Sequence, residues 1–155
     1  MNEIHLAEEK SLAATAAAVK ARGIAVEIVD TKADALARIK SLMPAGATVS
    51  TGASLTLKEI GFEEYLISKA HPWKNLKDAI VAEQDPARQG ELRRQSTLAD
   101  YFLGSVHAVA ESGELVIASA SGNQLGPYAY SARNVIWVVG AQKMGSGEGW
   151  NRKLA

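Results

Sequence analysis

The chain of 155 residues is long enough for one domain with a single hydrophobic core, and its 47% hydrophobic and 22% charged content is ordinary for a globular protein. Its 17 basic and 17 acidic side chains cancel, so the composition does not favour nucleic acid or an anionic membrane as a partner. Because the chain has no cysteine, it cannot form disulfides, cysteine-ligated zinc sites or iron–sulfur clusters.

The N-terminal part of the chain predicts helices and short strands in alternation. An alanine-rich helix is expected over residues 8–22, because alanine has the highest helix propensity. The β-branched run IAVEIV, residues 24–29, predicts a strand. Apolar residues at helical spacing predict a second helix over 33–43, and a short strand is expected at 47–50.

The middle of the chain, residues 68–95, is its least regular part, with proline-containing breaks between short helical patches. A further helix is expected over 96–104. The positions of Leu98, Tyr101 and Phe102, three and four residues apart, place these apolar side chains on one helical face.

The last part of the chain predicts mainly strands. Two β-like runs within residues 106–119, separated by ESGE, predict a hairpin. Residues 121–132 predict a glycine-containing loop that leads into a short helix, and the apolar run 134–140 is typical of a buried strand. Helices that alternate with short strands predict an α/β fold of three layers, with a mostly parallel sheet covered by helices on both faces. We therefore expect one domain over residues 1–140, followed by an irregular or truncated tail over 141–155.

The segment VSTGASLTLKEIG, residues 49–61, leads from a strand into a helix and is a candidate ligand site. In an open α/β sheet, ligands bind beyond the carboxyl ends of the strands, where unpaired amides at the start of a helix favour an anion. Gly52 would let a ligand approach the backbone, and Thr51, Ser54 and Thr56 offer hydroxyl donors. Ser54 is equally suited to cap the helix without any ligand, and neither a Walker motif nor GxGxxG is present. The residues alone leave both interpretations open.

Together with later segments, this loop resembles the lactate-utilisation (LUD) domain family. The resemblance covers about residues 46–143 and lies in the order and spacing of short motifs. The matching residues are Gly52, Ser54, Thr56 and Leu57 in the loop, Ala99 and Asp100 before the hairpin, Ala108, Gly113 and Leu115 within it, Gly122 and Asn123 after it, and Val138 to Lys143 at the end. Such domains are similar in fold to ribose-5-phosphate isomerase and the CoA transferases, in which a glycine–serine loop at a strand end binds phosphate.

The resemblance implies a site for a small anionic metabolite, a carboxylate or a phosphate, in a cleft at the carboxyl ends of the strands. We expect its ligand-binding residues to be Thr51, Gly52, Ser54, Thr56, Gly122, Asn123 and Lys143. The candidate catalytic residues are Glu111 and Asp100. Glu111 could act as a general base or be an exposed hairpin-end side chain, and Asp100 could equally be a buried hydrogen-bond acceptor.

Two departures from the family pattern bear on activity. Gln124 stands where many members carry arginine, which removes a permanent charge and a bidentate partner for a carboxylate. The isomerase relatives need two carboxylates ahead of the hairpin turn, and residues 104–111 supply only Glu111. Isomerisation of a sugar phosphate by proton abstraction is therefore poorly equipped.

Several functions stay open from the sequence. The resemblance implies a part in the utilisation of lactate or a related organic acid, beside separate iron–sulfur and other redox subunits, since this chain has neither a dinucleotide fingerprint nor cysteine. One alternative is a non-catalytic accessory or regulatory module that binds a metabolite, and another is a sugar-phosphate isomerase or a CoA transferase.

Location and partners are expectations from composition. The N-terminus is charged, unlike a secretory signal, and no apolar run reaches the roughly 20 residues of a membrane helix. We therefore expect a cytoplasmic protein that binds neither nucleic acid nor membrane. No cofactor or metal site is expected, and a homodimer stays open.

Overall fold

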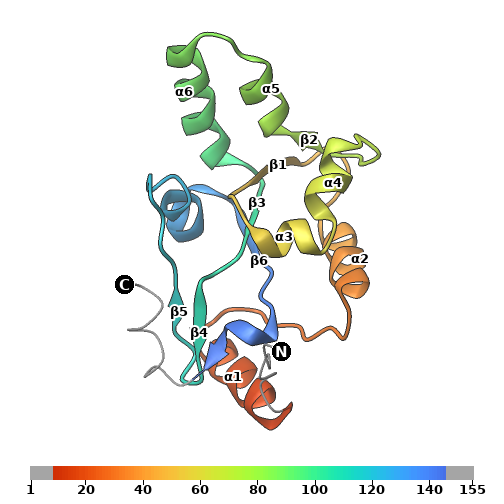
Figure 1. The fold of residues 1–155 in the computed structure, drawn as a ribbon, viewed down its shortest axis with the longest axis vertical. Helices are drawn as coiled ribbons and strands as arrows, with labels where there is room; N and C mark the ends of the chain where they lie inside the picture. Colours follow the sequence, from red (N-terminus) through yellow and green to blue (C-terminus); the bar gives the residue numbers. More distant parts are fainter. Residues whose placement is uncertain (1–8, 146–155) are drawn as a thin grey trace, which may run out of the picture. The chain divides into compact units, whose positions relative to one another are not determined.

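The computed structural model describes residues 9–145, and the chain within it forms two compact units (Figure 1). We name them the sheet unit and the hairpin unit. The sheet unit comprises Asp30–Ser105 and Ser119–Val138. The hairpin unit comprises the described parts of Met1–Val29, Val106–Ala118 and Val139–Ala155.

The sheet unit is built on four parallel strands in the order β2-β1-β3-β6. The prediction of an α/β fold with a mostly parallel sheet is therefore confirmed. In register, Ser50 lies beside Phe102, and Phe102 lies beside Val135. The strands are β1 (Thr48–Thr51), β2 (Lys74–Asn75), β3 (Tyr101–Gly104) and β6 (Asn134–Trp137).

Side chains alternate between the two faces of this sheet, and one face carries the main hydrophobic core. Val49 and Leu103 pack there against Ile39, Leu57 and Phe62, which come from three different helices. Burial of a side chain as large as leucine or phenylalanine contributes about 1.5–3 kcal/mol, so this face dominates the stability of the unit. The helices are α2 (Lys32–Leu42), α3 (Leu55–Glu59) and α4 (Phe62–Ile67).

The opposite face is covered by a short helical segment, η2 (Pro127–Ser131). The Tyr128 ring makes edge contacts with Phe102 and Trp137, at centroid distances of 5.4 and 5.5 Å. The Tyr128 phenol lies directly over Gly104, where an added Cβ would be 1.7 Å from the hydroxyl oxygen, so a larger residue at position 104 would collide with it. Helical segments thus cover both faces of the sheet, as the three-layer prediction requires.

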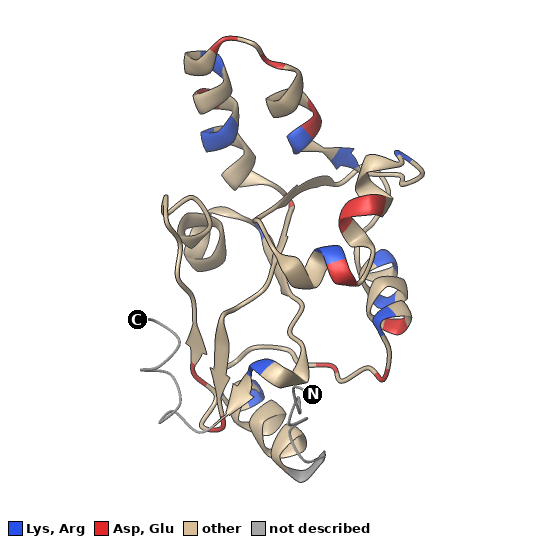
Figure 2. Ribbon diagram, viewed as in Figure 1, with Lys and Arg blue, Asp and Glu red and all other residues tan. Residues whose placement is uncertain are grey.

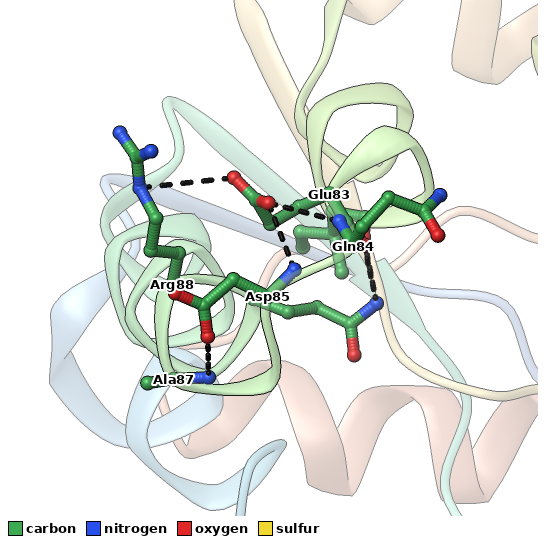
Figure 3. A network of polar contacts seen from close by, with 7 residues as sticks. Glu83, Gln84, Asp85, Ala87 and Arg88 are labelled. Carbon is green, nitrogen blue, oxygen red and sulfur yellow. Dashed lines mark hydrogen bonds and ion pairs between the residues drawn. The ribbon is translucent and has the colours of Figure 1, made fainter.

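The region over residues 68–95 is more regular than its sequence indicates, because local caps start its helices. Figure 1 shows α5 and α6 as a helical hairpin, and Figure 3 shows the turn between them. The Glu83 carboxylate accepts hydrogen bonds from the Gln84 and Asp85 amides, at 2.8 and 3.0 Å. The Asp85 side chain in turn accepts from the Ala87 amide at 2.9 Å and caps α6, whose first residue is proline. These elements are α5 (Leu76–Ala82), α6 (Pro86–Gln95) and η1 (Ser96–Leu98).

The hairpin unit confirms the predicted β-hairpin. Its antiparallel strands β4 and β5 pair across a turn, and β7 runs parallel to β4 on the other side. Gly113 in the turn has a φ of +91° and packs on the backbone of the first helix, where an added Cβ would lie 2.7 Å from the Ala18 carbonyl carbon. Arg22 holds the same turn by donating to the Ser112 carbonyl and pairing with Glu114. The elements are α1 (Glu9–Ala21), β4 (Ala108–Ala110), β5 (Leu115–Val116), η3 (Ala141–Lys143) and β7 (Met144–Gly145).

Two predicted elements are wrong, and one differs in burial. Residues 24–29 form no strand, because the β-branched run has no pairing partner among the described residues. The helix expected over 96–104 ends at Leu98, and the following residues form β3, which gains hydrogen bonds from strands on both sides. The last strand, β6, is half-buried because it lies at a sheet edge. Of the tail predicted over 141–155, residues 146–155 lie outside the described residues.

Candidate functional site

The parallel strands of the sheet unit place the opening loop at their shared carboxyl edge. Gly52 follows β1 directly, and its amide donates to the Leu103 carbonyl at 3.0 Å, so the loop leaves the sheet in a fixed direction. The chain then passes through Ala53 and Ser54 into α3. The loop therefore begins at the edge where ligands of open α/β sheets bind.

Ser54 caps α3, which confirms one of the two interpretations of the loop. Its side-chain oxygen accepts from the Leu57 amide at 3.2 Å, and its backbone is extended. The cap leaves other donors unused. Among residues 9–145, the amides of Ala53 and Ser54 have no hydrogen-bond acceptor. Capping and ligand contact are therefore compatible, because they use different groups of the same segment.

A shallow hollow of about 460 Å³ lies over this start of α3. Two lysines and one glutamate supply its charges: Lys58 from α3, Glu63 from α4 and Lys77 from α5. Figure 2 shows that basic and acidic residues are mixed over these helices, so the positive excess of the hollow is local. The full lining consists of Ala53, Ser54, Leu55, Lys58, Glu63 and Lys77.

Gln124 lies over Gly52, the first residue of the opening loop after β1. A Cβ built on Gly52 would lie 2.8 Å from Gln124 Cδ and 2.9 Å from Gln124 Nε2. Only glycine leaves room for the amide in this position. The side chain is half-buried, and in the described part of the chain it makes no hydrogen bond. The loop after the hairpin is thus brought to the opening loop, as the resemblance implies.

The two threonines of the opening loop, Thr51 and Thr56, are buried. Thr56 is buried and donates to Ser105 Oγ at 3.3 Å, so its hydroxyl joins α3 to the end of β3. Thr51 is 7% exposed, and its Oγ1 has no hydrogen-bond partner among the described residues. The Tyr128 hydroxyl donates to the Ser105 carbonyl at 3.4 Å, and burial raises the pKa of this tyrosine above its ordinary value.

Gly122 and Asn123 form the turn that carries Gln124. The Gly122 amide donates to Ser119 Oγ at 3.1 Å, and this hydroxyl donates to Asn123 Oδ1 at 3.5 Å. Gly122 has a φ of +73°, the left-handed conformation that glycine adopts without strain, and Asn123 is exposed. The ligand-binding roles of Gly122 and Asn123 stay predictions.

Asp100 lies at the amino ends of the strands, opposite to the opening loop. Its carboxylate accepts from the Thr48 amide at 3.0 Å and from Thr48 Oγ1 at 2.7 Å, and it forms an ion pair with Arg133 at 3.6 Å. The hydrogen bond from the Thr48 amide is the main cause that lowers the pKa of Asp100 below its ordinary value, followed by the hydrogen bond from the Thr48 hydroxyl. The positive charge of Arg133 lowers it further by a smaller amount. Four residues of strand, roughly 13 Å, separate this edge from the hollow. The geometry favours the bracing role for Asp100, and its catalytic role stays a prediction.

The last two candidates belong to the hairpin unit. Glu111 follows β4 and accepts from Ser11 Oγ at 3.1 Å on the exposed surface. Lys143 ends η3, and its Nζ donates to the Val106 carbonyl at 3.0 Å. Both contacts lie within that unit, so the roles of Glu111 as a base and of Lys143 as an anion clamp stay predictions.

Sequence reasoning missed Lys77 and gave Gln124 no position in the site. Lys77 lies on α5, in a region without a clear helical pattern, so no sequence signal placed it near Ser54. Gln124 was notable only as a departure from the family pattern, and its contact with Gly52 depends on the whole fold. Within residues 9–145, no group of three or more His, Asp or Glu side chains is arranged to hold a metal ion, and no helix there has the length and apolarity to cross a bilayer.

Comparison with known proteins gives one match. A family model described as the LUD domain matches residues 12–146, most of the chain. No curated protein and no solved structure matches it.

Proposed function

Because the chain belongs to the LUD domain family, which implies a part in lactate utilisation in general, we propose that it binds lactate or a related small carboxylate in the hollow at the start of α3. The observation that carries the proposal is the pair of lysines, Lys58 and Lys77, beside the unused amides of Ala53 and Ser54. Ammonium groups and backbone amides are the donors that a carboxylate prefers.

The openness of the hollow sets the expected affinity. Two unit charges 4 Å apart attract by about 1 kcal/mol in water and about 4 kcal/mol at an effective dielectric constant of 20. The Lys58 side chain is exposed and that of Lys77 half-buried, so the attraction lies toward the lower value for each. Glu63 reduces the net charge of the hollow. We expect a free energy of binding of about −4 to −5.5 kcal/mol, a Kd of roughly 1 to 0.1 mM.

The proposed role of this chain is to hold the acid, while other proteins carry the electrons. The chain offers no cysteine for a cluster and no dinucleotide fingerprint. We infer that separate iron–sulfur and other redox subunits act on the acid or accept its electrons. The cytoplasm is the proposed location of this assembly.

A non-catalytic metabolite-binding module is the second candidate, favoured by the placement of the carboxylates. Asp100 lies at the far edge of the sheet, and Glu63 is the one carboxylate in the lining of the hollow. General acid–base chemistry requires a positioned proton donor and acceptor at the reacting atoms. This placement disfavours a sugar-phosphate isomerase or CoA transferase at the hollow.

The test is titration calorimetry of the wild-type chain with lactate, pyruvate, inorganic phosphate and a simple sugar phosphate, with an assay for turnover of the sugar phosphate. We expect a Kd below about 1 mM for at least one carboxylate, and at least tenfold weaker binding in a Lys58→Ala, Lys77→Ala double variant. Ser54→Asp keeps the cap of α3 and adds a negative charge, so it should also abolish binding. Lys20→Ala, an exposed lysine on α1, is the matched control and should bind like the wild type.

Three outcomes of this titration separate the functions. Lactate binding that survives both the double variant and Ser54→Asp would place the ligand elsewhere and overturn the proposal. Turnover of a sugar phosphate would favour the isomerase instead. Binding without turnover by the isolated chain agrees with both the acid-holding role and the regulatory module, and capture of redox subunits from the native host then distinguishes the two.

A further inference from the structure

The Gln124 side chain occupies a position that the proposed site leaves unexplained. Its amide rests on Gly52, one residue before the hollow begins at Ala53. Two hydrogen bonds hold the turn that carries it. The Gly122 amide donates to Ser119 Oγ, and the Tyr128 amide donates to the Gln124 carbonyl at 3.2 Å. The backbone of Gln124 is therefore fixed, while the amide at the end of its side chain is unbonded within the described residues.

A second unbonded polar group belongs to the last residue of β1. Thr51 precedes Gly52, and its hydroxyl is buried without a partner among residues 9–145. Buried polar groups are almost always hydrogen-bonded, and each one left unpaired costs about 1–3 kcal/mol. Because side chains alternate along a strand, the Thr51 hydroxyl lies on the face of Val49, and the Gln124 amide lies over Gly52. They are two separate unpaired groups at the end of β1, and neither is charged.

We infer that Gln124 determines which acids the site accepts, by contacting an uncharged polar group of the ligand while the carboxylate lies in the hollow. This inference rests on the proposed function. An amide can both donate and accept a hydrogen bond, so it suits a hydroxyl or a carbonyl oxygen. It gives no charge compensation to a second carboxylate, which would have to leave water without a cationic partner. The site then prefers a hydroxy or oxo monocarboxylate to a dicarboxylate.

The size of the ligand follows from the chain between the two contact points. Gly52 and Ser54 are two residues apart, so their Cα atoms are at most roughly 7 Å apart. An acid of three or four carbons, with a hydrogen bond of about 2.9 Å at each end, reaches between groups that far apart. Arginine in place of Gln124 would present a permanent charge with bidentate geometry and reverse the preference in favour of a second carboxylate.

Three acids of equal carbon number test the inference: lactate, propionate, which lacks the hydroxyl, and malonate, which has a second carboxylate. Calorimetry on the wild type should give three- to tenfold tighter binding of lactate than of propionate, the value of one hydrogen bond. Gln124→Leu should bring the ratio of lactate affinity to propionate affinity close to one, with little effect on the affinity for propionate. Gln124→Arg should bind malonate at least tenfold more tightly than lactate. Gln84→Leu, an exposed glutamine in the α5–α6 turn, is the matched control.

A second variant displaces the same amide without changing it. In Gly52→Ala the new methyl group meets only the flexible end of Gln124, so the side chain can move aside and the fold is retained. This variant should also reduce the lactate-to-propionate ratio. If the ratio of lactate affinity to propionate affinity is the wild-type value in both Gln124→Leu and Gly52→Ala, the inference is overturned. The proposed function is then left intact. If none of the three acids binds the wild type, the proposed function fails, and the inference with it.

Discussion

Asp100 is the residue whose contacts most clearly link charge to folding. Its carboxylate accepts two hydrogen bonds from Thr48, and these hold its pKa below the ordinary value, chiefly through the Thr48 amide. A carboxylate with a lowered pKa in the folded state adds stability above its unfolded pKa, near 4, and loses that contribution as the pH falls through the folded value. We therefore expect Asp100→Asn to show a smaller loss of stability between pH 5 and pH 2 than the wild type, measured by urea unfolding.

The control for this prediction is Asp30→Asn, which removes the same charge at an exposed position. It should reproduce the wild-type pH dependence. If Asp100→Asn has the same pH profile as the wild type, Asp100 is not the brace between β1 and β3 that the geometry indicates.

For single residues, the sequence predicts roles that depend on neighbouring residues, and it does not predict contacts between residues far apart in the chain. The cap at Ser54 follows from residues 54–57 alone and is confirmed. The contact of Gln124 with Gly52 joins two loops far apart in the sequence, so no local pattern could predict it.

At the scale of elements, α3 tests whether the opening loop has one role or two. Ser54→Ala removes the side-chain acceptor of the Leu57 amide and should cost about 1 kcal/mol of the free energy of unfolding. Ser54→Asp keeps an acceptor there and should stay within roughly 0.5 kcal/mol of the wild type. Chemical denaturation measures both, and lactate titration of the same variants separates stability from binding. A loss of stability as large in Ser54→Asp as in Ser54→Ala would contradict the capping geometry.

The two mispredicted elements have one physical cause. The helical spacing of Leu98, Tyr101 and Phe102 is real, but β3 gains a parallel partner on each side, and such non-local pairing outweighs local propensity. The run 24–29 has strand propensity but no partner in the described structure, and Ile28 and Val29 stay exposed. The strands at 48–51 and 134–137 and the hairpin were predictable, because local turns or continuous apolar runs mark them.

At the scale of the whole molecule, the division into two units predicts separable stabilities. Gly113→Ala introduces strain at a φ of +91° and a collision with the backbone of α1, which should destabilise the hairpin unit by about 2 kcal/mol or more. Hydrogen exchange should then be roughly thirtyfold faster at the amides of β4 and β5, while β1 and β3 keep their protection.

The matched control is Gly122→Ala, which has similar backbone strain but no atom within 4 Å of the added methyl group. It should leave exchange in β4 and β5 unchanged. Equal acceleration of exchange in both units by Gly113→Ala would mean that the chain opens as one cooperative unit. The α/β class and parallel sheet were predictable from the alternation of elements, whereas the assembly of the hairpin unit from three separate segments was not, since it depends on contacts between distant parts of the chain.

The central claim, that a small carboxylate lies over the start of α3, is tested most directly by recording amide NMR spectra during a titration with lactate. The account predicts saturable shifts of the Ala53, Ser54 and Leu55 amides and of the Gln124 side-chain amide, with a common Kd. The amides of Thr48 and Tyr101, at the opposite edge of the sheet, should not move. Saturable shifts confined to that opposite edge, or no saturable shift anywhere up to tens of millimolar lactate, would contradict it.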